Sequence, residues 1–267
     1  MERRKGPGPD FGLSLNFVDE RTENMKQLLI IALISLTVTV HAESRFDVLL
    51  ETGAVWQNRN DTQISPSAGT RFEIDGLNKG PFLHYRIDTY FRMNQYHALR
   101  LVYAPFSIEV TGRSDRSVVF NGQTFSNAED LTVEYKFNSY RLSYVYGFWG
   151  FGEDQINIGF TGKIRDAETT FRQSNLRSSY DNVGFVPLAY FEYQKPLWAD
   201  WLMNLTVDAA AASQGRAVDA AIKFRRKIGV DSSLGAGFRT LEGGADNDKV
   251  FTFSWFNYAL LELKMGF

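Results

Sequence analysis

The sequence predicts an all-β fold, a transmembrane antiparallel up-and-down β-barrel of about ten strands, and three observations lead to it. Amphipathic runs with a period of two recur from Arg45 to Phe267. No stretch after Ala42 is long and apolar enough to span a membrane as a helix. The apolar faces of the runs carry more bulky side chains than the interior of a ten-stranded barrel can hold, so these faces are expected to contact lipid.

The period-two runs define the expected strands, with eight or twelve as the alternative counts. They span residues 45–57, 82–93, 96–111, 131–148, 155–171, 182–194, 200–212, 216–227, 233–241 and 250–267. The connections 58–81, 112–130, 172–181 and 242–249 are mostly longer and polar, and most of the others are short turns. Short turns at one end and longer loops at the other are typical of an outer-membrane barrel.

The two faces of each run determine which side meets lipid. One face is rich in aromatic and aliphatic residues, and the opposite face carries glycines and long charged side chains. A closed barrel is the only sheet that leaves no backbone group unpaired in lipid. In the run 131–148, "LTVEYKF" and "YRLSYVYGF" differ in phase, which indicates either a bulge near Asn138 or Ser139 or a strand that continues beyond the membrane. The alternative is a soluble ligand-binding barrel with the apolar face inside.

The N-terminal part predicts an export signal. The stretch "MKQLLIIALISLTVTVHAES" has a basic start, an apolar run and a small-residue cleavage site, so residues 25–42 are interpreted as a signal peptide cleaved after Ala42. Residues 1–24 then form a misassigned upstream extension, and 43–267 form the barrel. Localisation in the outer membrane is expected, with periplasmic termini and extracellular long loops.

Composition excludes several classes of protein. The chain has no cysteine, which excludes disulfides, zinc–cysteine sites and thiol catalysis. The net charge of -2, with basic residues spread along the chain, argues against a nucleic-acid partner. No cofactor or metal is predicted, and the protein is expected to be a monomer.

The last strand resembles the assembly signal of bacterial outer-membrane barrels, an aromatic terminal residue preceded by apolar residues at alternate positions. The matching residues are Ala259, Leu261, Leu263, Met265 and Phe267. The segments "FNSYRLSYVY", "TGKIRDAE", "NVGFVPL" and "SQGRAVDAAIKF" are similar to small uncharacterised outer-membrane barrel proteins of Gram-negative bacteria. The resemblance implies a fold, a compartment and the barrel-assembly machinery as a partner during insertion, but no reaction.

Charged residues on the inward face form the candidate site. This lumen polar network comprises Glu51, His84, Arg86, Asp88, Arg100, Arg141, Lys163, Arg165, Glu192, Asp208, Asp219, Lys223, Arg225, Arg239, Glu262 and Lys264. In a narrow barrel such side chains meet and pair, which predicts a plug and a structural or adhesive role. The alternative is a narrow, anion-leaning path for small solutes, since bases outnumber acids.

Catalysis is the other alternative, although no enzyme is predicted. After cleavage the histidines are His84 and His97, and His97 falls beside a short turn, the wrong end for a rim hydrolase. His84 lies near the outer end. Asp88 is about 13 Å from it along the same strand, so only an acid from a neighbouring strand could complete a site.

The loops offer further candidate surfaces. Asp246, Asn247 and Asp248 could suggest calcium, but without the spacing of a calcium loop they indicate a solvated turn. Asn121-Gly122 predicts a hairpin inside 112–130. Arginines suit the phosphates of lipopolysaccharide, so outer-membrane lipid and lipopolysaccharide are the predicted partners. The basic residues of the outer loops are Arg59, Arg71, Lys79, Arg113, Arg116, Arg172 and Arg177.

Overall fold

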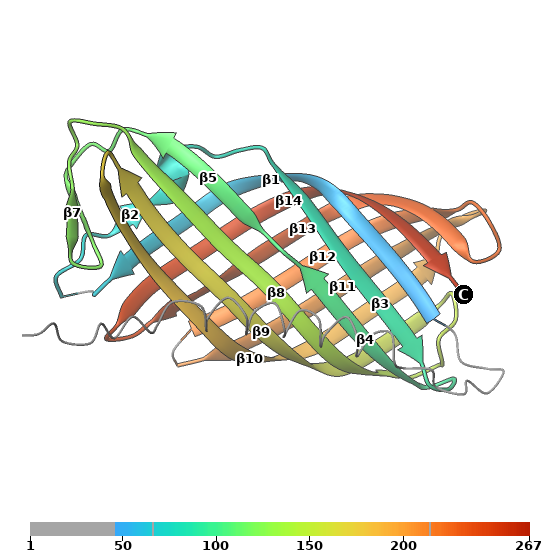
Figure 1. Cartoon of the computed structure of the whole chain (residues 1–267). Helices are drawn as coiled ribbons and strands as arrows, with labels where there is room; N and C mark the ends of the chain where they lie inside the picture. The colour runs from blue at the N-terminus through green and yellow to red at the C-terminus, as the bar shows by residue number, and fades with distance from the viewer. Residues whose placement is uncertain (1–45, 66, 214) are drawn as a thin grey trace, which may run out of the picture. The chain divides into compact units, whose positions relative to one another are not determined.

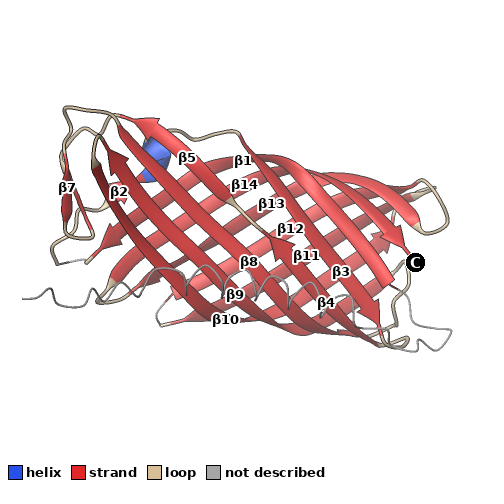
Figure 2. Cartoon of the chain, viewed as in Figure 1, coloured by secondary structure: helices blue, strands red, loops and turns tan. Residues whose placement is uncertain are grey.

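A computed structural model describes residues 46–65, 67–213 and 215–267, and these form a closed antiparallel β-barrel (Figures 1 and 2). The wall follows the order β14-β13-β12-β11-β10-β9-β8-β4-β3-β1, and pairing of β1 with β14 closes it. The predicted ten-stranded transmembrane barrel is confirmed. The predicted residues 1–24, the signal peptide and its cleavage site lie outside the described residues. No helix among the described residues is long and apolar enough to cross a membrane.

The strand bounds agree with most of the period-two runs. The wall strands are β1 (Phe46–Ile64), β3 (Phe82–Arg92), β4 (His97–Ala104), β8 (Leu131–Gly147), β9 (Gln155–Gln173), β10 (Leu176–Pro196), β11 (Trp201–Ala212), β12 (Gly215–Lys227), β13 (Ser232–Asp246) and β14 (Val250–Gly266). Four short strands and one 3-10 helix add to them: β2 (Phe72–Glu73), η1 (Ile74–Gly76), β5 (Ser107–Gly112), β6 (Val118–Phe120) and β7 (Gln123–Phe125).

Three polar segments expected as loops are wholly or partly continuations of strands. In 58–81, β1 continues to Ile64, paired with Val250 of β14. In 172–181, β9 and β10 stay paired up to Gln173 and Leu176. In 242–249, β13 and β14 stay paired up to Asp246 and Phe251. The polar side chains of these stretches indicate that this part of the wall lies outside the membrane. The barrel therefore has a terminal end, where the backbones of Phe46 and Phe267 pair. We call the opposite end, which carries β2 and β7, the far end (Figure 1).

The predicted hairpin in 112–130 is confirmed. Strands β6 and β7 pair from Val118–Phe125 to Phe120–Gln123. Asn121 and Gly122 form the turn with φ angles of 47° and 79°. Asparagine and glycine are the residues that accept such left-handed conformations most readily.

The phase change in β8 has a physical explanation, and no bulge is needed. The register of β8 with β9 is continuous from Thr132–Arg172 to Gly147–Asn157. Toward the terminal end, Leu142 and Tyr144 face outward and are exposed. Toward the far end, Leu131 and Val133 face inward and are buried. The apolar face changes sides where the surroundings of the wall change from lipid to water, so the strand continues beyond the membrane.

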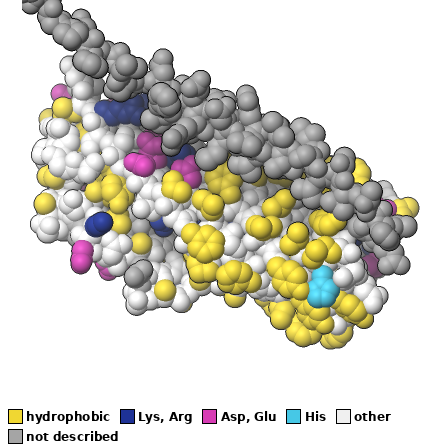
Figure 3. All heavy atoms as spheres, turned by 60° about the horizontal axis from the view of Figure 1, so that its bottom comes forward, with side chains coloured by type: hydrophobic (Ala, Val, Ile, Leu, Met, Phe, Trp, Pro, Cys, Tyr) yellow, Lys and Arg dark blue, Asp and Glu magenta, His cyan; other side chains and the backbone are white. Residues whose placement is uncertain are grey.

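An exposed apolar band covers the wall toward the terminal end. It includes Leu83 at 75% exposure and Phe160 at 58%, values that water would disfavour for side chains of this size. Figure 3 shows hydrophobic side chains crowded over the right-hand part of the wall. The soluble ligand-binding alternative is wrong, because the apolar side chains here face outward and the charged ones face inward.

The far end has an apolar interior, which we call the far-end core. It is made of Val55, Ile64, Phe72, Ile74, Phe106, Ile108, Val110, Val118, Phe120, Phe125, Leu131, Val133, Tyr135, Phe171, Val250, Phe256, Tyr258 and Leu260. Phe171 lies at its centre, stacked on Phe120 with ring centroids 4.1 Å apart and edge-on to Phe72 at 5.3 Å. The β6–β7 hairpin thus folds onto the barrel interior and helps to fill it.

Candidate functional site in the barrel interior

Six charged side chains form a closed ring across the lumen at membrane level. Arg86 and Asp88 come from β3, Arg100 from β4, Arg141 from β8, Asp208 from β11 and Asp219 from β12. All six are at most 8% exposed. Charges alternate around this ion-pair ring, so three guanidinium groups balance three carboxylates.

The links of the ion-pair ring are within contact distance all the way round. Arg86 pairs with Asp219 at 3.1 Å and with Asp88 at 3.2 Å. Arg100 pairs with Asp88 at 2.8 Å and with Asp208 at 3.1 Å. Arg141 pairs with Asp208 at 2.8 Å and with Asp219 at 2.6 Å. Every carboxylate therefore pairs with two arginines of the ring, which is how buried charges are stabilised.

A second group of charges connects this ring to the terminal end. Arg239 bridges from Asp219 to Glu51, with 2.8 Å between Arg239 Nη2 and Glu51 Oε2. Lys223 contacts both Glu51 and Glu262, and Glu262 also accepts a hydrogen bond from Arg225. The interior is therefore filled by connected ion pairs and not by isolated charges.

The remaining predicted network residues occupy four different surroundings. Glu192 accepts hydrogen bonds from Asn157, Tyr190 and Asn204. Lys264 lies toward the terminal end, 3.3 Å from Asp47. Arg165 lies toward the far end and donates a hydrogen bond to Asn182. Lys163 is 4% exposed and has no carboxylate partner within the described chain; its Nζ lies 4.8 Å from the centre of the Phe137 ring.

Sequence reasoning missed several interior polar residues. Asp47 is 2% exposed and pairs with both Arg92 and Lys264. Tyr90 and Tyr190 join their hydroxyl groups across the lumen at 2.7 Å. Asp47 lies four residues before Glu51 on the same face, so the alternation itself contained the signal.

His84 is sealed inside the barrel and does not stand at an open rim. Its Nε2 lies 3.2 Å from Glu51 Oε1, an acid supplied by the neighbouring strand, and its ring meets Tyr258 edge-on at 4.9 Å. The side chain is 4% exposed, and within the described part of the chain its ring hydrogen-bonds to Glu51 and to no serine hydroxyl. The expected position near the outer rim is therefore wrong, because the far-end core lies above it.

The terminal end contains a pocket of about 180 Å³ with both polar and apolar lining residues. Its lining includes Asp47, Arg92, Arg225, Lys227 and Lys264. Within the described residues, no group of acids and histidines is placed to hold a metal ion. At the calcium-like loop, Asn247 Oδ1 accepts hydrogen bonds from the backbone of Lys249 and Val250, so the predicted solvated turn is what forms.

The fold is similar to solved structures of bacterial outer-membrane barrels. The attachment invasion locus protein Ail of Yersinia pestis is 8% identical, with 82% of this chain and 99% of that chain covered and a TM-score of 0.39. Neisserial surface protein A is 10% identical, with 82% and 96% covered and a TM-score of 0.34. OprG of Pseudomonas aeruginosa is 10% identical, with 84% and 97% covered and a TM-score of 0.34.

Likenesses this weak carry no argument about what the chain binds or transports. No protein-family model matches the sequence, and no curated protein does.

Proposed function

We propose that this protein is a closed, non-conducting outer-membrane barrel that serves as a structural or adhesive scaffold. Its terminal end lies in the periplasm and its far end lies outside the cell. The observation that carries this proposal is the ion-pair ring, which crosses the lumen with every carboxylate doubly paired. No enzymatic role is proposed, because His84 is buried without access for a substrate.

Two barriers of opposite chemistry lie in series along the lumen. A hydrated ion at membrane level would have to separate the paired groups of the ion-pair ring, and each of them would lose partners in a poorly solvated interior. Beyond the ring the ion would meet the far-end core, where apolar side chains offer no replacement for its hydration shell. Both barriers oppose passage.

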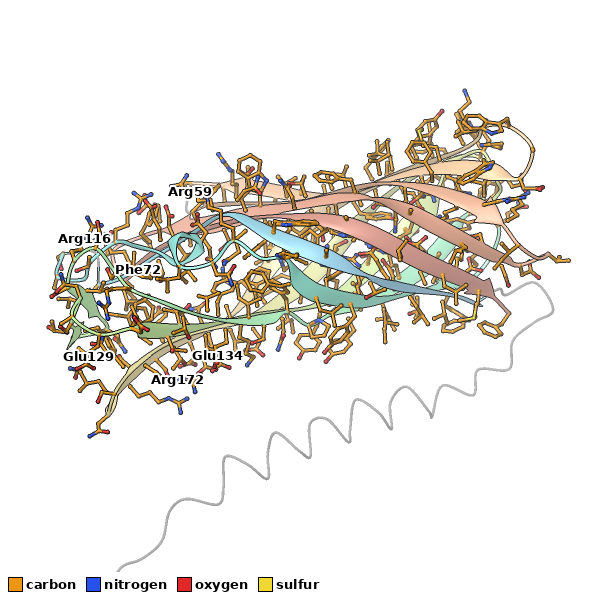
Figure 4. The ribbon with its side chains drawn as sticks, turned by 90° about the horizontal axis from the view of Figure 1, so that it is seen from above. Arg59, Phe72, Arg116, Glu129, Glu134 and Arg172 are labelled. Carbon is orange, nitrogen blue, oxygen red and sulfur yellow. The ribbon has the colours of Figure 1, made fainter. Side chains whose placement is uncertain are left out.

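The far end supports a scaffold role because paired strands and a packed apolar core form it. Strands β1, β9, β10, β13 and β14 extend into it, and the β6–β7 hairpin is anchored by Phe120 on Phe171. Charged residues such as Arg116, Glu129 and Arg172 surround this end (Figure 4). A preorganised polar surface of this kind suits contact with other surface molecules.

Liposome swelling tests the proposal. Vesicles that contain the folded protein should swell in isotonic small sugars, amino acids and carboxylates no faster than empty vesicles, while a general porin gives rapid swelling. Faster swelling with carboxylates than with neutral sugars would instead support the narrow, anion-leaning path, for which the buried Lys163 is the candidate base. Swelling that is faster than in empty vesicles and equally fast with all solutes would contradict both.

A further inference from the structure

Three arginines surround two phenylalanines on the outer surface of the wall, just beyond the apolar band. The arginine–phenylalanine patch consists of Arg59 of β1, Arg71 between β1 and β2, Arg216 of β12, and Phe251 and Phe253 of β14. These elements are neighbours in the wall, because β12, β13, β14 and β1 are successive strands. Figure 4 shows Arg59 on the outside of the barrel.

The aromatic rings hold the guanidinium groups in place. The Arg59 guanidinium carbon lies 4.5 Å from the centre of the Phe253 ring, and that of Arg216 lies 5.3 Å from the same ring. Arg71 lies 4.3 Å from the centre of Phe251. Such cation–π contacts restrict long side chains that would otherwise move freely at a surface.

Gly244 makes this packing feasible. It pairs with Arg216 on one side and with Phe253 on the other, so it separates the two side chains across β13. A Cβ atom at position 244 would lie 3.1 Å from Phe253 Cδ2 and only 2.2 Å from the carbonyl oxygen of Thr252. The absence of a side chain at this position lets Arg216 reach over the Phe253 ring.

The patch keeps hydrogen-bond donors free for a ligand. Arg59 and Arg71 both donate to Oδ2 of Asp61, a carboxylate that is 3% exposed beneath them. Arg216 pairs with Glu242 through Nε and Nη2, which leaves its Nη1 available. The three arginine side chains are 42% to 59% exposed. Four carboxylates oppose an anion here. Asp61 and Glu242 pair with the arginines, and Glu73 and Asp75 act on Arg59 from nearby. Glu73 is exposed and lies opposite Asp61 in the pairing of β1 with β2.

The position of the patch matches the head groups of the outer leaflet. Trp255 is exposed on β14 at the edge of the apolar band, and interfacial aromatic residues mark this level in barrels. Phe253 lies two residues nearer the far end on the same strand, about 7 Å from Trp255. The guanidinium groups therefore stand immediately above the acyl chains, where lipid phosphates lie.

We infer that the arginine–phenylalanine patch binds a phosphate group of a glycolipid in the outer leaflet, such as lipid A. Guanidinium groups recognise phosphate oxygens through paired N–H donors. Three arginines from different elements converge on one surface and are held by two rings, and the neighbouring Trp255 packs against the acyl region of the same lipid. This site is separate from the interior. It rests on the proposed orientation, with the far end outside the cell, and not on the scaffold role.

Binding of bisphosphorylated lipid A to the folded protein in detergent, measured by native mass spectrometry, tests the inference. Three ligands are compared: lipid A, dephosphorylated lipid A and inorganic phosphate. The variant R59Q/R71Q/R216Q should bind lipid A at least about tenfold more weakly. The control R113Q/R177Q, which removes two arginines elsewhere at the far end, should bind as the wild type does. Folding of each variant is verified by the mobility shift on heating.

Two further arms keep the inference testable if the triple variant does not fold. Replacement of Glu73 by Gln removes one of the opposing acids and should strengthen lipid A binding, and the single variant R216Q should weaken it. Unchanged binding by both variants would overturn the inference. Equal binding of dephosphorylated lipid A would show that phosphate is not recognised. Displacement of lipid A by inorganic phosphate at a similar concentration would show a free-phosphate site. Either result would overturn the inference.

Discussion

Replacement of Asp219 by Asn tests the energetic role of the ion-pair ring. Asp219 is 5% exposed and accepts hydrogen bonds from Arg86 at 3.1 Å, from Arg141 at 2.6 Å and from Arg239. Asparagine has nearly the same shape but no charge, so the substitution leaves three guanidinium groups with one fewer negative charge between them. Breaking a buried ion pair by removal of one partner costs about 3–5 kcal/mol.

Two companion variants accompany Asp219→Asn. One is a control at an exposed aspartate, and the other tests whether the loss of stability comes from the unbalanced charge. Asp181→Asn changes an exposed aspartate of β10 and should alter the free energy of unfolding by less than about 0.5 kcal/mol. Adding Arg86→Met to Asp219→Asn restores the balance of charge in the ring, and the double variant should regain at least about 1 kcal/mol relative to Asp219→Asn alone.

Urea-induced unfolding from lipid vesicles, followed by tryptophan fluorescence, gives the free energies. A loss of less than about 1 kcal/mol for Asp219→Asn would refute the reasoning, because it would mean that water already compensates the ring charges. A double variant that is less stable than Asp219→Asn by the full cost of a second substitution would also refute it.

Three further predictions concern the far end and the unpaired base. Phe171→Ala should destabilise the far-end core by about 3–5 kcal/mol and expose the β6–β7 hairpin to limited proteolysis, whereas Phe185→Ala on the lipid-facing surface should leave cleavage unchanged. Burial raises the pKa of Tyr135 to about 12. The stabilisation from keeping this hydroxyl neutral is therefore complete below pH 10 and is lost as the pH rises through 12. The free energy of unfolding should fall by roughly 3 kcal/mol over this range. The variant Tyr135→Phe should not show this fall. Lys163→Met should raise the free energy of unfolding by about 1 kcal/mol or more, because an apolar chain replaces a buried cation without a carboxylate partner in the described part of the chain. A decrease would show that the interior stabilises the charge of Lys163.

Alternation predicted the wall of the barrel because lipid imposes one rule on every strand at membrane level. Leu142 and Arg141 on β8 show that rule directly, one exposed and the other buried. The same rule predicted which charges face inward. It does not specify which strand lies opposite, so the contact between Arg86 and Asp219, 133 residues apart, required the closed structure.

The far end was harder to predict because its surroundings change while its sequence remains strand-like. At Tyr135 and Val133 the apolar face has moved inside, and only the three-dimensional structure shows that the register is continuous. The polar residues of 172–181 suggested a loop because strand propensity depends strongly on context. In the structure these residues remain in paired strands, and Tyr180 packs against the far-end core. The arginine–phenylalanine patch was equally hidden, since Arg216 and Phe253 are brought together only by the pairing of β12, β13 and β14.

Conductance of the folded barrel, residues 43–267, in a planar lipid bilayer tests the closed lumen most directly. The protein, verified as folded by its mobility shift on heating, should give no steady current steps at moderate voltage in molar salt. Replacement of Arg141 by Ala, which removes two links of the ion-pair ring, should lower stability while the far-end core still prevents steady conduction. Steady, anion-biased steps from the wild-type protein that change with Arg141→Ala would contradict the closed lumen and show that the inward charges line a path.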